Sequence, residues 1–155
     1  MHHSAAQWIV DLLSDKNVPF QICGGLAARA YGSHRELNDI DLFVPGEFFP
    51  VVVEAGRDFV SKPAAQRQEE GWDLTYVQFQ YEGVKVEVGN ADDVSIYDSV
   101  NHVWMPLNID FSRYVTVHLL GLDLPVMLKD DLIHYKLILS RPVDIEDIRA
   151  ISNRD

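Results

Sequence analysis

The sequence is poor in cysteine and in basic residues, and it has no long apolar run. Cys23 is the only cysteine, so an intrachain disulfide and a cysteine-based zinc site are both excluded. The chain has 13 basic residues against 24 acidic ones, a formal net charge of −11. That charge repels phosphate backbones and disfavours broad nucleic-acid binding. The longest apolar runs are far too short to cross a membrane.

What remains is the composition of an ordinary globular protein. Of the 155 residues, 47% are hydrophobic and 24% are charged. This length suits one domain, residues 1–155, with a core large enough to fold alone. The first residues do not resemble a signal peptide, and no repeat or linker is visible. We therefore expect a single cytoplasmic domain without a membrane segment.

Two aspartates separated by one residue stand out in the first third of the chain. Asp39 and Asp41 flank Ile40 in an apolar stretch that ends at a Pro-Gly pair, which indicates a strand. Side chains alternate along a strand, so both carboxylates point to the same face. Neighbouring carboxylates repel each other unless one of them is protonated or a cation lies between them. Because Mg²⁺ binds carboxylates together with phosphate oxygens and water, the pair predicts a divalent metal site.

A pair of glycines precedes these aspartates. Gly24 and Gly25 follow a short apolar strand and open a helical pattern over residues 26–31. Residues without a Cβ let backbone N–H groups approach an anion at the start of a helix. A Gly-Gly pair by itself more often marks a turn. The order strand, glycine pair, helix, turn and acidic strand is more informative, and it suggests metal and phosphate together.

This arrangement resembles the core of the nucleotidyltransferase superfamily. The matching positions are Gly24-Gly25, the helix at 26–31, Arg35 and the Asp39-Ile40-Asp41 strand. The resemblance is strongest to the small antibiotic nucleotidyltransferases and to those of bacterial toxin–antitoxin systems. It implies Mg²⁺ or Mn²⁺ as the metal, ATP or another NTP as the donor, and a third carboxylate on a neighbouring strand.

Glu87 is the best candidate for that third carboxylate. Residues 73–81 and 84–89 form a predicted β-hairpin, and Glu87 lies on the face opposite a stripe of valines. The pattern alone is more typical of the solvent face of an antiparallel sheet. The resemblance makes Glu87 a metal ligand or a proton acceptor, with Asp92 and Asp93 as the fallback.

A lysine in the last quarter of the chain lies on a predicted helix over residues 129–140. Lys136 falls on the side of the helix that carries part of its apolar stripe. Such a lysine either extends past the edge of the core or points its ammonium group at an anion. The resemblance implies the second role. It assigns Lys136 and Arg35 to the triphosphate, together with the backbone of Gly24 and Gly25.

The remaining segments complete an α+β fold. We expect a helix over 47–58, a mobile polar loop over 61–72, a hairpin over 114–124 and a final helix with Asp144 as its N-cap. Residues 101–112 have no clear assignment, and their aromatic residues either cover the sheet or line an acceptor pocket. The predicted architecture is a small mixed sheet with helices packed on one face and the acidic residues on the open side.

The resulting hypothesis is a metal-dependent nucleotidyltransferase that moves NMP from an NTP to a hydroxyl group. The acceptor stays open: a small molecule, an RNA end or a protein. One alternative is a catalytically degenerate, antitoxin-like protein that binds a protein partner, because Asn38 stands where relatives often have Thr or His. Another is a phosphatase with a nucleophilic aspartate. That enzyme would need an apolar strand directly before Asp39, whereas Glu36-Leu37-Asn38 stands there.

Overall fold

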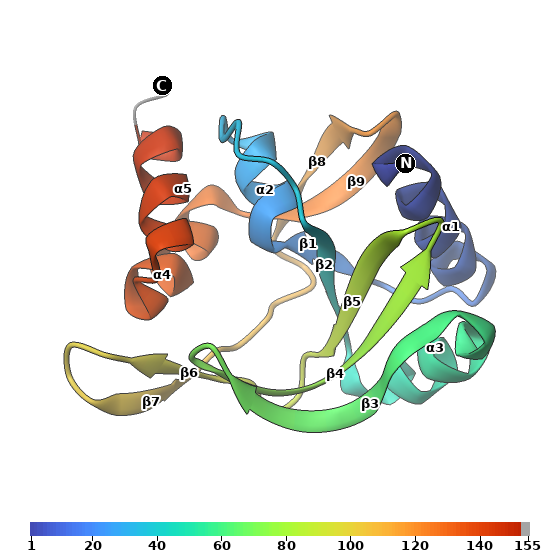
Figure 1. Ribbon diagram of the computed structural model, residues 1–155, viewed down its shortest axis with the longest axis horizontal. Coiled ribbons are helices and arrows are strands. Elements are labelled where there is room, and N and C mark those ends of the chain that lie inside the picture. The colour runs from blue at the N-terminus through green and yellow to red at the C-terminus, as the bar shows by residue number, and fades with distance from the viewer. Residues whose placement is uncertain (153–155) are drawn as a thin grey trace.

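A computed structural model describes residues 1–152 as a mixed β-sheet with two groups of helices packed against it (Figure 1). The helices are α1 (His2–Asp15), α2 (Gly24–Ala30), α3 (Phe49–Ala55), α4 (Lys129–Leu139) and α5 (Pro142–Ser152), with the 3-10 helices η1 (Gly46–Phe48) and η2 (Arg57–Phe59) beside α3. The strands are β1 (Gln21–Cys23), β2 (Asp39–Val44), β3 (Val60–Glu69), β4 (Trp72–Tyr81), β5 (Val84–Asn90), β6 (Ser95–Asp98), β7 (Val103–Pro106), β8 (Tyr114–Leu119) and β9 (Leu122–Met127). Within the described residues the sheet has nine strands in the order β7-β6-β4-β5-β2-β1-β9-β8, with β3 paired to β4.

Strands β2 and β5 form the centre of this sheet. They run parallel, with Asp39 opposite Lys85, Asp41 opposite Glu87 and Phe43 opposite Gly89. The residues between these positions point to the other face and are buried in the core, each contributing about 1.5–3 kcal/mol by burial. Alternation along two adjacent strands therefore places the acidic residues together on one face.

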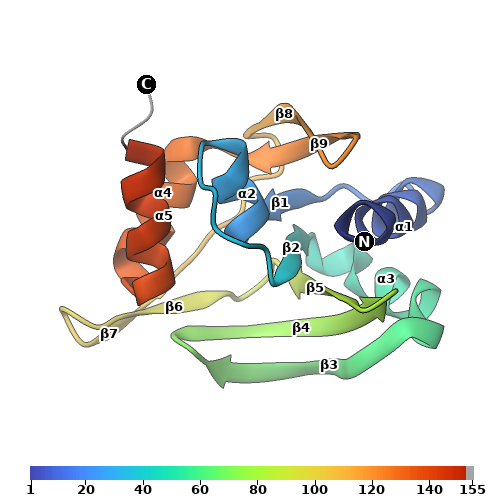
Figure 2. The ribbon, with the colours of Figure 1, turned by 45° about the horizontal axis from the view of Figure 1, so that its top comes forward.

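The helices form two groups at opposite ends of the molecule (Figure 2). Helix α1 packs on β4, β5 and α3. Helix α2 contacts β1, β2 and β9, and α4 contacts α2, α5 and β6. This second group brings the C-terminal helices beside the glycine turn that opens α2. None of the helices in residues 1–152 is long and apolar enough to span a bilayer.

The predicted α+β class and its mixed sheet are confirmed, but the polar segment 61–72 is not a loop. It forms β3, which pairs antiparallel with β4 from Val60 to Glu69. Nearly all of its side chains are exposed, so the strand is joined to the sheet mainly through its backbone. A strand of this kind carries no alternating apolar pattern, which explains why the sequence did not reveal it.

The structure assigns one segment that the sequence left open and corrects one prediction. Residues 103–106 form strand β7, which pairs with β6 at an edge of the sheet. Asp144 is not an N-cap, because α5 already begins at Pro142 and Asp144 lies buried in its first turn. Its carboxylate accepts the backbone N–H of Arg141 at 3.1 Å. The predicted hairpins over 73–89 and 114–124 and the helix over 129–140 are confirmed.

Candidate active site

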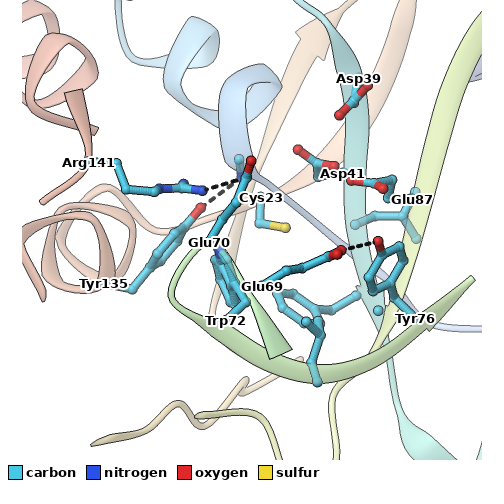
Figure 3. Close-up of a pocket in the computed structure, with 15 residues that line it drawn as sticks. Cys23, Asp39, Asp41, Glu69, Glu70, Trp72, Tyr76, Glu87, Tyr135 and Arg141 are labelled. Atoms are coloured by element: carbon cyan, nitrogen blue, oxygen red, sulfur yellow. Dashed lines mark hydrogen bonds and ion pairs between the residues drawn. The ribbon is translucent and has the colours of Figure 1, made fainter. Parts of the chain in front are cut away.

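Three carboxylates meet where β2 and β5 run side by side. Asp39, Asp41 and Glu87 each offer a carboxylate oxygen within 4.8 Å of the others, and all three side chains are partly buried. Figure 3 shows them on one wall of a pocket. The grouping follows from the register, since Asp41 lies directly opposite Glu87 and Asp39 shares the face of Asp41.

The electrostatics of this acidic triad oppose full ionisation. Burial, followed by the negative charges of Glu87 and Asp39, raises the pKa of Asp41 to about 8. Burial also raises the pKa of Glu87, although a hydrogen bond from Gln78 acts in the opposite direction. The pKa of Asp39 is raised by burial as well. Three acids held in this way favour either a shared proton or a cation.

The turn formed by Gly24 and Gly25 lies directly beside the triad. Gly24 has φ +63°, and a Cβ at this position would lie 2.5 Å from Oδ2 of Asp41. Its N–H donates to the hydroxyl of Tyr135 at 2.9 Å. Gly25 is also confined, because a Cβ there would lie 2.8 Å from a guanidinium nitrogen of Arg35. The turn therefore needs glycine for its close approach to Asp41 and to Arg35.

Adding a methyl group at Gly24 tests this fit. We expect Gly24→Ala to lower the rate of any metal-dependent reaction at this site by about a hundredfold or more, because the new Cβ displaces the Asp41 carboxylate and small misplacements of reacting groups are costly. The measurement is the steady-state rate as a function of Mg²⁺ concentration.

Gly83→Ala is the matched control. Gly83 has φ +82°, so its alanine variant suffers a similar backbone penalty, but nothing lies within 4 Å of the added Cβ. Equal losses in the two variants would contradict a specific role for the contact between Gly24 and Asp41.

The two cations assigned to the triphosphate lie in a buried ion-pair network. The Lys136 ammonium is 3.3 Å from Asp144 and 3.0 Å from Asp147, and its side chain is 2% exposed. Arg35 donates to both oxygens of Asp147, at 3.0 and 2.9 Å. Ser33 donates to the same carboxylate. Neither Lys136 nor Arg35 is among the residues that line the pocket.

The pocket in front of the triad has a volume of about 200 Å³. Aromatic side chains of Trp72, Tyr76 and Tyr135 form part of its wall (Figure 3). Glu69 accepts a hydrogen bond from the hydroxyl of Tyr76. Glu70 also lines the cavity.

Sequence reasoning missed these two glutamates because it interpreted their segment as a loop. The sequence Glu69-Glu70-Gly71-Trp72 is a turn signal between strands, and it would have located them once β3 was recognised. Arg141, which follows helix α4, also lines the pocket.

The sequence matches a nucleotidyltransferase family profile, and the fold resembles solved nucleotidyltransferase structures. A family profile described as nucleotidyl transferase of unknown function (DUF2204) matches residues 2–154. A crystal structure from Thermotoga maritima, TM1012, classed as a nucleotidyltransferase, superposes with a TM-score of 0.72 at 22% identity, over 97% of this chain and 91% of that one. No curated protein matches the sequence significantly.

Two antibiotic-modifying enzymes share the fold. The lincosamide antibiotic adenylyltransferase LnuA, bound to lincomycin, has a TM-score of 0.64 at 15% identity, over 95% of this chain and 94% of that one. ANT(2″)-Ia in complex with adenylyl-2″-tobramycin has a TM-score of 0.65 at 17% identity, over 98% of this chain and 88% of that one. At these identities the similarity establishes the fold alone.

Proposed function

This chain belongs to the family of nucleotidyl transferases of unknown function, and on that premise we propose that it moves a nucleoside monophosphate from an NTP to a hydroxyl group of an acceptor. The observation that supports this activity most strongly is the triad of Asp39, Asp41 and Glu87, with oxygens within 4.8 Å of one another. ATP is the donor we test first, because LnuA is named an adenylyltransferase and ANT(2″)-Ia holds an adenylylated antibiotic.

The donor set of the triad fits a divalent cation. It consists of carboxylate oxygens, the ligands that Mg²⁺ and Mn²⁺ prefer, and their mutual repulsion would be relieved by a bound ion. Such an ion would neutralise charge on the triphosphate and on the transition state. The raised pKa of Asp41 means that binding the ion would displace a proton at neutral pH.

Glu87 is suited to take the acceptor's proton. Burial raises its pKa, which brings it nearer to the range useful for proton transfer, and Gln78 fixes its orientation by donating to Oε2 at 2.9 Å. In the proposed step the hydroxyl proton passes to Glu87 and the oxygen forms a bond to the α-phosphorus. The bond from that phosphorus to the bridging oxygen breaks, and pyrophosphate leaves.

The acceptor that we propose is a small hydroxyl-bearing molecule. Two structures with the same fold hold small-molecule antibiotics or their adenylyl derivative. The pocket wall here carries Glu69 and Glu70 besides the triad, which opposes the approach of an RNA backbone. A protein hydroxyl and an RNA end remain alternatives, as does a partner-binding protein without catalysis, and the last of these predicts that no NTP binds.

Calorimetric titration of the four NTPs with Mg²⁺ tests the proposed activity. We expect at least one NTP to bind to the wild-type protein and its binding to disappear in the Asp39→Asn/Asp41→Asn variant, because that variant loses two carboxylates of the metal site. The control is Asp92→Asn/Asp93→Asn, which removes the same charge from an exposed loop. The absence of NTP binding to folded wild-type protein would overturn the proposal in favour of a partner-binding role.

A further inference from the structure

Arg141 is the only basic side chain that lines the pocket in the described part of the chain. The other charged residues of the lining are all acidic: Asp39, Asp41, Glu69, Glu70 and Glu87. Figure 3 shows Arg141 on the wall opposite the triad, directed into the pocket. Building on the proposed nucleotidyl transfer, we propose that Arg141 binds the triphosphate and that Glu70 competes with the phosphate for the same guanidinium edge.

One edge of the Arg141 guanidinium is already fixed. Its Nε and Nη2 donate to the two oxygens of Asp144 at 2.7 and 3.1 Å. Asp144 is fully buried, and it also pairs with Lys136 at 3.3 Å. A planar guanidinium held along one edge has little freedom to turn, so its remaining Nη1 keeps a defined direction.

That remaining edge faces Glu70 across the mouth of the pocket. Nη1 of Arg141 is 3.6 Å from Oε2 of Glu70, and the Glu70 side chain is 80% exposed. An ion pair that exposed contributes little, because water screens it and ordering the side chains costs entropy. A triphosphate group carries more negative charge in total than a carboxylate, and Arg–phosphate hydrogen bonds are strong, so it would replace Glu70 at this edge.

The charge balance of the neighbouring network also points to Arg141. Three cations, Lys136, Arg35 and Arg141, surround only two fully buried acids, Asp144 and Asp147. Arg35 and Lys136 are paired with these carboxylates and do not line the pocket. The buried acids leave one positive charge uncompensated, and among the described residues only exposed carboxylates balance it, namely Glu146 beside Arg35 and Glu70 beside Arg141. Of the three cations, Arg141 is the one that lines the pocket.

Nucleotide affinity distinguishes competition for Arg141 from a purely structural salt bridge. If Glu70 competes with the phosphate, replacing Glu70 and replacing Arg141 should change this affinity in opposite directions. With Mg²⁺ and α,β-methylene-ATP, which cannot be transferred, we expect Glu70→Gln to tighten binding by about two- to fivefold. Arg141→Gln should weaken it by about ten- to a hundredfold, and Arg141→Lys should weaken it less. A salt bridge that merely shapes the pocket would weaken binding in both variants.

The double variant Glu70→Gln/Arg141→Gln separates competition from a general change of charge. If Glu70 competes for Arg141, the gain from Glu70→Gln disappears once Arg141 is replaced. A gain that persists in the double variant, or no gain in Glu70→Gln, overturns the competition. Thermal melts identify a variant that does not fold, in which case Glu70→Gln is measured in the Arg141→Lys background, where competition for a weaker phosphate contact predicts a smaller gain than in the Arg141 background.

Glu82→Gln serves as the surface control. Glu82 is exposed, and it has a left-handed backbone and a following glycine, as Glu70 does, but it does not line the pocket. We expect its nucleotide affinity to equal that of the wild type. Failure of the wild-type protein to bind the nucleotide would overturn the proposed function itself, whereas normal wild-type binding with no effect of Arg141→Gln would overturn only this inference.

Discussion

Replacing Asp41 by asparagine is expected to abolish nucleotidyl transfer while making the metal-free protein more stable. Loss of a carboxylate from the proposed metal site should remove several kcal/mol of transition-state stabilisation, at least about a thousandfold in rate. Stability should rise because Asp41 is held beside Glu87 and Asp39 in a site that disfavours its charge. We expect a gain on the order of 1 kcal/mol, or about 3 °C in melting temperature for a domain of this size.

The pH dependence of stability gives the sign of this effect. The pKa of Asp41 is raised from 3.8 to about 8 in the folded protein, so the folded state holds the proton that the unfolded state has lost between those values. The free energy of unfolding of the metal-free wild type should therefore decrease as pH rises from about 4 to 8. The Asp41→Asn variant should show a flatter profile.

Denaturant unfolding at several pH values, with and without Mg²⁺, measures both effects. Mg²⁺ should stabilise the wild type and leave Asp41→Asn nearly unchanged, because only the wild type retains the full site. Asp58→Asn, at an exposed position, is the control for loss of one negative charge. A variant that is less stable than the wild type at pH 8 would contradict the account of the triad.

Replacing Lys136 by methionine should lower the free energy of unfolding by about 3–5 kcal/mol. The Lys136 ammonium is buried between Asp144 and Asp147, both fully buried themselves. Removing one partner of a buried ion network leaves a carboxylate insufficiently compensated, and that is the costly change. Arg35 and Arg141 still contact the two acids, which places the loss toward the lower end of this range.

The same variant separates the two roles considered for Lys136. Denaturant unfolding and the affinity for MgATP are measured on one preparation, with Lys16→Met as the exposed control. A large loss of stability with modest loss of affinity would assign Lys136 to the helix network. Unchanged stability with a large loss of affinity would support the direct triphosphate contact that the sequence predicts.

The acidic triad could be predicted because its geometry is local to two strands. Alternation places Asp39 and Asp41 on one face, and the hairpin pattern around Glu82-Gly83 places Glu87 opposite a stripe of valines. The resemblance then indicated that the two strands are neighbours, which the register of Asp41 and Glu87 confirms. Glycine pairs are common in turns, but here a glycine is needed at position 24 because a Cβ would collide with the carboxylate of Asp41.

The ion-pair partners of Arg35 and Lys136 could not be predicted from the spacing of residues in the sequence. Arg35 pairs with Asp147, which lies 112 residues away, and no local pattern encodes that contact. Lys136 and Asp144 are separated by a helix end whose geometry decides whether they meet. Strand β3 was missed for a related reason, because its pairing depends on backbone groups of β4 and not on an apolar pattern of its own.

The register of β2 against β5 has a consequence for how the chain folds. A slip of two residues keeps every side chain on its proper face, so the apolar pattern does not oppose it. It would place Asp41 opposite Lys85 and Phe43 opposite Glu87, so the strands keep one Asp–Lys pair, which the native register forms through Asp39, and lose the repulsion between Asp41 and Glu87. Shape distinguishes the two states, since the Phe43 ring lies where a Cβ on Gly89 would be 2.8 Å away. The native register therefore forms despite the repulsion between Asp41 and Glu87. We infer that it is favoured because Gly89 leaves room for the ring of Phe43.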